Sequence, residues 1–174
     1  VLEQDEKGYS GTFGHSGLVE ITIPKTVRET GTSMFEWCSS LERLAVLGGE
    51  NSGLDKWGYT GTKYPCMEEL TLDIPEIGIY SEYVPGLKKL VLGNRVEKIP
   101  DKAWSRAERL SSGWSKLEEI VWPEHLTYLG DTDFSELTSL KELNMPASID
   151  EYKEAAIIKA PSSLTKMMVS EGIE

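Results

Sequence analysis

Charged residues recur at one fixed place in a frame that repeats along the chain, and the chemistry they offer is ionic recognition. The frame consists of an apolar residue, two free positions, an apolar residue, one free position and an apolar residue. Its third position holds acids and bases that mostly alternate in sign, namely Glu20, Arg43, Glu69, Lys89, Glu119, Glu142 and Lys166. Opposite charges on neighbouring strands stabilise a sheet by about 0.2–1 kcal/mol each. This charge column predicts a ladder that sets strand register or a stripe that recognises a charged protein, with Glu119 and Glu142 as its like-charged neighbours.

The fifth position of the frame supplies small or weakly apolar residues, which should share the exposed face with the charge column. They are Thr22, Ala45, Thr71, Val91, Val121, Asn144 and Met168. Curved repeat proteins often bind partners on such a concave face. Because the fifth positions lack the aromatic and arginine anchors of protein hot spots, this candidate site has no evident anchor of its own.

A second candidate surface consists of aromatic residues outside the frame. Trp57, Tyr59 and Tyr64 lie in an irregular glycine-rich stretch, and Trp104 and Trp114 flank a longer segment. Exposed rings would stack on sugars or anchor a protein partner, whereas packed rings would fill the wide side of irregular coils. The sequence is compatible with both interpretations.

Residue constellations for catalysis are missing from the sequence. The two histidines, His15 and His125, lie in different repeats, and neither belongs to a nucleophile motif. The sequence contains no HExxH, GxSxG or phosphate-binding loop motif, and its acidic turns do not match an EF-hand calcium loop. We therefore expect a protein that is not an enzyme and that uses no cofactor and no metal.

The frame itself predicts the elements that position these residues. It occurs seven times, as Leu18-Ile21-Ile23, Leu41-Leu44-Val46, Met67-Leu70-Leu72, Leu87-Leu90-Leu92, Leu117-Ile120-Trp122, Leu140-Leu143-Met145 and Leu164-Met167-Val169. Alternation with a period of two within each block is typical of a short, half-buried strand. Repeats of this length stack as coils of a leucine-rich-repeat solenoid, here with one seven-stranded parallel sheet on the concave face.

The segments between the strands predict an irregular convex side. We expect turns, 3₁₀ pieces and short helices at 103–110 and 152–158. Residues 1–174 are interpreted as a single domain of about seven coils, in which residues 1–17 end a preceding coil and the array is truncated at both ends.

One stretch, from Leu18 to Leu41, carries the longer pattern L-x-x-I-x-I-P-x-x-V-x-x-x-G-x-x-x-F-x-x-C-x-x-L. A close second copy runs from Leu117 to Leu140, and the pattern resembles the BspA-like class of bacterial leucine-rich repeats. The resemblance implies a noncatalytic, adhesin-like binding module that is extracellular or on the bacterial cell surface. Its partner would be a protein or glycan on a host or neighbouring cell. A glycan-binding module and a structural spacer in a larger surface protein remain as alternatives.

Composition excludes two classes of partner and bears on the cysteines. The formal net charge is −11, and such an acidic surface repels nucleic-acid phosphates. No apolar run approaches the roughly 18 residues of a membrane span, so we expect no membrane insertion by this segment. Cys38 and Cys66 occupy different positions in adjacent coils, which favours two packed free thiols over a disulfide.

Overall fold

The computed structural model of the chain is built from short strands. It describes residues 11–31, 33–50, 63–75, 77, 83–99, 114–130, 134–135, 137–146, 149, 151–152 and 160–169. Ten strands and no α-helix lie within these ranges, and Tyr83 and Trp114 have 3₁₀ conformation. The expected helix at 103–110 lies outside the described residues, as do residues 153–158 of the other expected helix.

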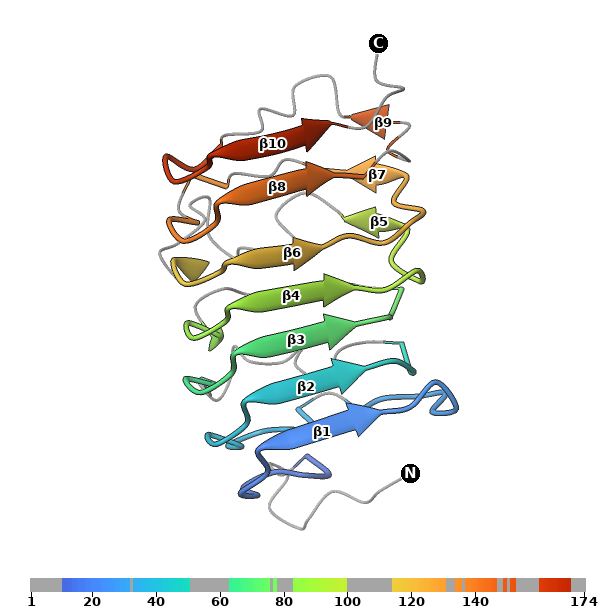
Figure 1. Cartoon of the computed structure of the whole chain (residues 1–174). Helices are drawn as coiled ribbons and strands as arrows, with labels where there is room; N and C mark the ends of the chain where they lie inside the picture. The colour runs from blue at the N-terminus through green and yellow to red at the C-terminus, as the bar shows by residue number, and fades with distance from the viewer. Residues whose placement is uncertain are drawn as a thin grey trace.

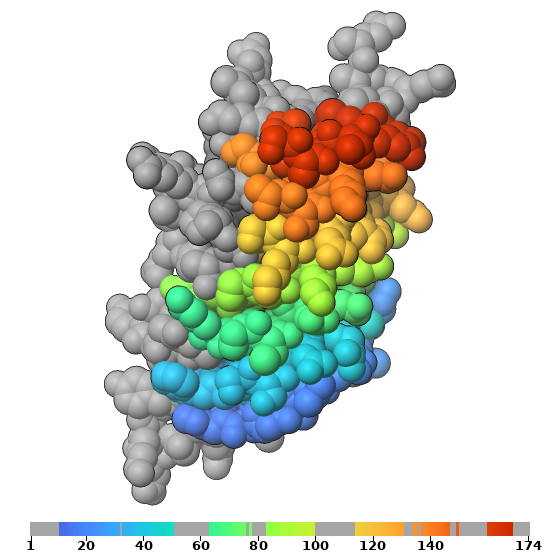
Figure 2. Space-filling model, turned by 60° about the vertical axis from the view of Figure 1, so that its left-hand side comes forward, coloured from blue at the N-terminus to red at the C-terminus, as the bar shows by residue number. Residues whose placement is uncertain are grey.

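Each of the seven frames forms a strand, as the alternating pattern predicts. The strands are β1 (Glu20–Ile23), β2 (Arg43–Val46), β3 (Glu69–Leu72), β4 (Lys89–Leu92), β6 (Glu119–Val121), β8 (Glu142–Met145) and β10 (Lys166–Val169). They lie one above another in chain order (Figure 1). In the space-filling view the described coils follow one another as successive bands (Figure 2). The solenoid predicted from the frame is confirmed.

The expectation of one continuous seven-stranded sheet is wrong in one respect. The strands pair in parallel as a five-stranded sheet, β1-β2-β3-β4-β6, and a separate two-stranded sheet, β8-β10. Within each sheet the register joins equivalent frame positions, so that Glu20 pairs with Arg43 and Leu44 pairs with Leu70. The sheet is interrupted between β6 and β8 (Figure 1).

The first, fourth and sixth positions of the frame form the core behind the sheet. Leu41, Met67, Leu87 and Leu117, which begin four successive frames, are each 0% exposed. Burial of one such side chain stabilises the fold by about 1.5–3 kcal/mol. Because each coil covers the apolar residues of the next, the core is continuous along the stack.

A second parallel sheet follows the main one in three successive coils, and the sequence did not predict it. It consists of β5 (Lys98–Ile99), β7 (Tyr128–Leu129) and β9 (Glu151–Tyr152), in the order β5-β7-β9. Tyr152 therefore belongs to a strand and not to the helix expected at 152–158. The second sheet hydrogen-bonds coils side by side at a place away from the frame.

A buried carboxylate links four coils on the side where the main strands end. Asp73, 7% exposed, accepts a hydrogen bond from the Arg95 backbone N–H at 2.9 Å. Its second oxygen lies 3.4 Å from Lys25 Nζ, and Arg95 Nη2 donates to the Gly49 carbonyl at 3.0 Å. These bonds satisfy polar groups where the chain turns away from the sheet.

Candidate binding surface

The charge column forms as predicted on the exposed face of the sheet. In register, Glu20 faces Arg43, Arg43 faces Glu69, Glu69 faces Lys89, and Lys89 faces Glu119. A carboxylate oxygen of Glu20 lies 3.0 Å from Arg43 Nη2, and Lys89 Nζ lies 2.8 Å from Glu119. The column is therefore a set of solvated ion pairs across neighbouring strands.

The neighbouring acids raise the pKa values of two bases in the column, Arg43 and Lys89. For Arg43, the hydrogen bond to Glu20 contributes most, and the nearby charge of Glu69 adds to it. For Lys89, the hydrogen bond to Glu119 contributes most to the raised pKa, and Glu69 again adds. Both Arg43 and Lys89 thus have an acid on each side, because the signs alternate along this part of the column.

The fifth positions lie on the same face as the column and vary in exposure. Thr22, Val121 and Asn144 are exposed, whereas Thr71 and Val91 are half-buried between their neighbours. Part of this surface is a shallow depression of about 100 Å³, and the predicted residues that it brings together are Glu20, Thr22, Arg43, Glu69 and Thr71.

The prediction that Tyr64 belongs to an exposed aromatic surface is wrong. Tyr64 is 2% exposed, and its hydroxyl donates a hydrogen bond to the Phe35 carbonyl at 2.9 Å. Burial raises the pKa of this hydroxyl. Trp114 is also in the core, at 4% exposed, whereas Trp57, Tyr59 and Trp104 lie outside the described residues.

A signal for the burial of Tyr64 and Trp114 was present in the sequence. Both stand three residues before the start of a frame, as Cys38 does, and Cys38 is 0% exposed. At all three places the carbonyl accepts a hydrogen bond from the first residue of the frame, which closes the same tight turn. At these three places the turn, and not the type of side chain, decides burial.

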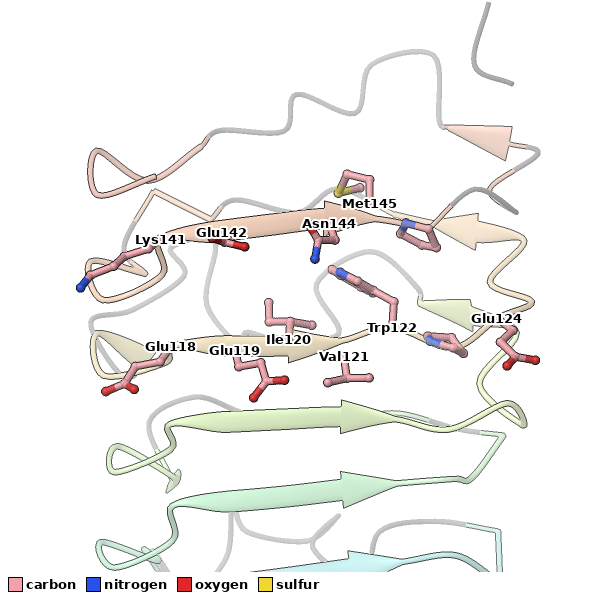
Figure 3. A pocket seen from close by; sticks show the side chains of 12 residues that line it. Glu118, Glu119, Ile120, Val121, Trp122, Glu124, Lys141, Glu142, Asn144 and Met145 are labelled. Carbon is pink, nitrogen blue, oxygen red and sulfur yellow. The ribbon is translucent and has the colours of Figure 1, made fainter. Parts of the chain in front are cut away.

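A cleft of about 720 Å³ opens between β6 and β8, where the main sheet is interrupted. Charged residues line both ends of it, with Lys141 among the acids at one end and Glu124 at the other (Figure 3), and Ile120, Trp122 and Met145 line its inner part. In the close view the side chains of Ile120 and Trp122 lie in the space between the two strands (Figure 3). Glu119, Glu142, Val121 and Asn144, all predicted site residues, border this cleft.

Comparison with family models matches residues 6–111 and 109–174 to the BspA type leucine rich repeat region, in six copies. The chain belongs to this family. Leucine-rich repeats of this type are in general noncatalytic scaffolds for protein interaction, and the proteins that carry them are typically bacterial surface or secreted proteins. No curated protein and no solved structure gives a significant match to the chain.

The BspA-type array also presents one aromatic residue that the sequence analysis missed. Trp37 is 46% exposed, and its ring stacks on His15 with centroids 5.9 Å apart. Both residues have positive φ, 63° for Trp37 and 58° for His15, at equivalent places in adjacent coils. The left-handed backbone is uncommon for a bulky residue. Trp37 lies outside the repeating frame, so the period of the frame carried no signal for its exposure.

The cysteines of the BspA-type coils are both free, but only one is packed. Cys38 is buried, and its thiol donates to the Phe13 carbonyl at 3.0 Å. Cys66 is exposed, which corrects the expectation of two packed thiols.

Among the described residues there is no group of three or more His, Cys, Asp or Glu residues that could hold a metal ion. Nor do these residues include a helix with the length and apolarity needed to cross a membrane.

Proposed function

We propose that the chain is a noncatalytic binding module of a bacterial surface or secreted protein, and that its main sheet engages a protein partner. The domain that carries this function comprises residues 1–174. The partner would lie on a host or neighbouring cell, and the interaction would be adhesin-like. Membership of the BspA-type family supports the general class of function.

The observation that carries the proposal is the charge column on an open, regular sheet face. Glu20, Arg43 and Glu69 stand in register, with Thr22 and Thr71 beside them around a shallow depression. A rigid parallel sheet fixes the backbone that carries these groups, so that only the side chains lose conformational freedom on binding. Complementary charges on a protein partner would set the association rate and the orientation of the complex.

Two alternatives separate from this proposal by experiment. A glycan-binding module would need exposed aromatic rings, and Trp37 is the exposed tryptophan among the described residues. Binding to a glycan array that is lost in Trp37→Gly would favour that alternative, and glycine suits the left-handed backbone at this position. A structural spacer would show no saturable binding at all.

The test is a saturation binding assay of the labelled chain on host epithelial cells and on immobilised extracellular-matrix proteins. The variant Glu69→Lys reverses one charge at the centre of the column. We expect the dissociation constant to rise about tenfold, because interfacial like-charge contacts cost on the order of 1 kcal/mol or more.

Glu29→Lys is the matched control, since Glu29 is exposed and lies outside the sheet, yet the net charge changes equally. We expect this variant to bind within twofold of the natural sequence. Equal weakening by both variants would attribute binding to net charge alone and would overturn the role of the column. Absence of saturable binding to every surface would overturn the proposed function.

A further inference from the structure

The large apolar side chains that are exposed among the described residues are Val19, Trp37, Val121, Met167 and Met168. Two of them, Val19 and Trp37, lie at one edge of the sheet, where the chain enters β1 and β2. The turns at this edge lie to the left of the strands in Figure 1, and Figure 2 brings that side forward. The exposed positions of the described main strands carry no aromatic side chain, so this edge offers an anchor that the sheet face lacks.

The turn that carries Trp37 is fixed by contacts that do not involve its indole. The His15 N–H donates to the carbonyl of the residue before Trp37 at 2.8 Å. The Cys38 thiol donates to the Phe13 carbonyl at 3.0 Å, and the rings of Phe13 and Phe35 stack with centroids 5.7 Å apart. These contacts join the turn to the preceding coil, so the turn does not depend on the indole.

The backbone at Trp37 is better suited to glycine than to a large side chain. Its φ is 63°, in the left-handed region, where bulky residues are uncommon. Glycine would form the same turn without steric cost, and 46% of the residue is exposed, so neither the turn nor the core explains a tryptophan here. Residues held in this region cluster at functional sites, which directs attention to contact with another molecule.

The indole of Trp37 is supported on one face by a second ring. The His15 imidazole stacks on it, with centroids 5.9 Å apart and an angle of 19° between the ring planes. His15 has a similar φ of 58° in the preceding turn, so the two rings project from equivalent places. A ring that is already supported loses little side-chain freedom when a partner binds it.

The accessible charges around Trp37 are balanced, although the chain as a whole is acidic. Arg43 lies 3.0 Å from Glu20 and 3.5 Å from Glu42. Lys63, in the equivalent turn of the next coil, is exposed and adds a second base. The residue before Trp37 is a glutamate, but it is 4% exposed and adds no accessible charge. A partner is therefore selected here by where its charges lie and not by its net charge.

This edge is continuous with the part of the sheet that carries the proposed function. The N–H groups of Glu42 and Arg43 both donate to the Val19 carbonyl, at 2.8 and 3.1 Å, where the turns run into β1 and β2. The depression of about 100 Å³ lies on β1, β2 and β3. A protein partner buries about 800 Å² of each surface, so its contact would extend past the rim of this depression, toward Val19 and Trp37.

We propose that Trp37 is the anchor by which the chain holds its protein partner, while the charges at the start of β1 and β2 set the orientation. The partner would present an apolar pocket for the indole, with a base toward Glu20 and an acid toward Arg43 or Lys63. Tryptophan is among the residues that most often dominate the affinity of protein interfaces, whereas charges around it mainly give rate and specificity. This inference rests on the proposed binding function and locates its main contact.

The test compares Trp37→Gly with the natural chain in saturation binding to epithelial cells and to immobilised laminin. We expect the dissociation constant to rise about 30-fold, as is typical when the central residue of an interface is lost. The melting temperature should not fall, because glycine suits the backbone here. Met168→Ala is the control, since Met168 is 47% exposed but belongs to β10 at the other end of the stack. This variant should bind within twofold of the natural chain.

Trp37→His guards against a change in the turn, because His15 has the same backbone conformation in the preceding turn. We expect this variant to fold and to bind at least about fivefold more weakly than the natural chain. Binding by folded Trp37→His that equals that of the natural chain would overturn the inference, as would equal weakening by Met168→Ala.

Treatment of the cells separates a protein partner from a glycan. We expect trypsin to remove binding and periodate oxidation of the cell-surface sugars to leave it, and the reverse result would overturn the inference in favour of a sugar. If Trp37→Gly binds at full strength while Glu69→Lys still weakens binding, the anchor is overturned and the proposed function stands. Absence of saturable binding by the natural chain would overturn both.

Discussion

The strands from β2 to β4 and the strands β6 and β8 are built from the same frame, yet β2, β3 and β4 pair by hydrogen bonds whereas β6 and β8 do not. In the paired strands, aliphatic residues such as Val46 and Leu72 fill the sixth frame position and are 0% exposed. At the open junction a tryptophan takes this place, and a proline removes the following donor. Neighbouring parallel strands are roughly 4.8 Å apart, which leaves little room for an indole between them. The comparison indicates that two residues, Trp122 after β6 and Pro146 after β8, keep these strands from pairing.

The largest effect is expected in the closed part, from Asp73→Ala. This change removes the buried acceptor of the part-buried Arg95 N–H and the partner of the exposed Lys25. We expect the free energy of unfolding to fall by about 2–3 kcal/mol, because the Arg95 N–H loses its charged acceptor. Urea denaturation followed by circular dichroism measures this. Asn94→Ala, whose exposed side chain bonds Glu124, is the control and should change stability by less than about 1 kcal/mol.

A smaller loss is expected from Gly86→Ala, which tests how closely the coils approach in the closed part. An added Cβ would lie 2.6 Å from the Pro65 carbonyl oxygen and 3.0 Å from that of Met67, both in the preceding coil. We expect a loss of about 1–3 kcal/mol from this crowding. At Gly17 a Cβ would meet no atom within 4 Å, so Gly17→Ala should be nearly neutral. Equal melting temperatures for the two variants would contradict the close approach.

Trp122→Leu tests this comparison, because a leucine at the sixth frame position should allow β6 and β8 to pair by hydrogen bonds. We expect the amides of Ile120 and Asn144 to exchange with solvent about tenfold more slowly, since new ladder bonds would protect them. Hydrogen exchange followed by NMR measures the protection directly. Trp114→Leu is the control, because this residue of the same coil is 4% exposed and lies in the core. It should lower stability without slowing exchange at the junction.

The smallest effect concerns an exposed ion pair beside the charge column. The hydrogen bond from Lys88, at 2.8 Å, and its charge lower the pKa of Glu68. A lowered pKa in the folded state stabilises the fold above the ordinary value of 4.5, and this contribution is lost as the pH falls through the lowered pKa. In Glu68→Gln we expect a slightly flatter dependence of melting temperature on pH below 4.5. High salt should reduce the difference between the two proteins, and a difference insensitive to salt would contradict the assignment.

Much of the fold was predictable because the frame repeats with a clear period. Alternation in blocks such as Leu87-Leu90-Leu92 is enough to predict a strand, its buried side and its register with the next coil. The second sheet was not predictable, since two-residue strands such as Lys98–Ile99 carry no periodic pattern. Tyr64 was misplaced because a glycine-rich neighbourhood was read as a loop, although its position before Met67 matched that of the buried Cys38.

The candidate site was predictable in its charges and not in its shape. Period two places Glu20, Arg43 and Glu69 on one face whatever the rest of the chain does. The cleft depends on the volume of a single indole in a position where any apolar residue fits the pattern. The like charges of Glu119 and Glu142 were the one trace of it in the sequence.

The interruption of the main sheet also bears on how the array loses its structure. In a stack where each coil touches only its neighbours, stability is a sum of coil and interface terms, and the weakest interface sets the boundary between cooperative units. The coils up to β6 and those of β8 and β10 should therefore melt as two blocks, with the boundary at the cleft. Trp122→Leu, which should let β6 and β8 pair, would fuse the two blocks, so that the variant would unfold in a single sharper transition.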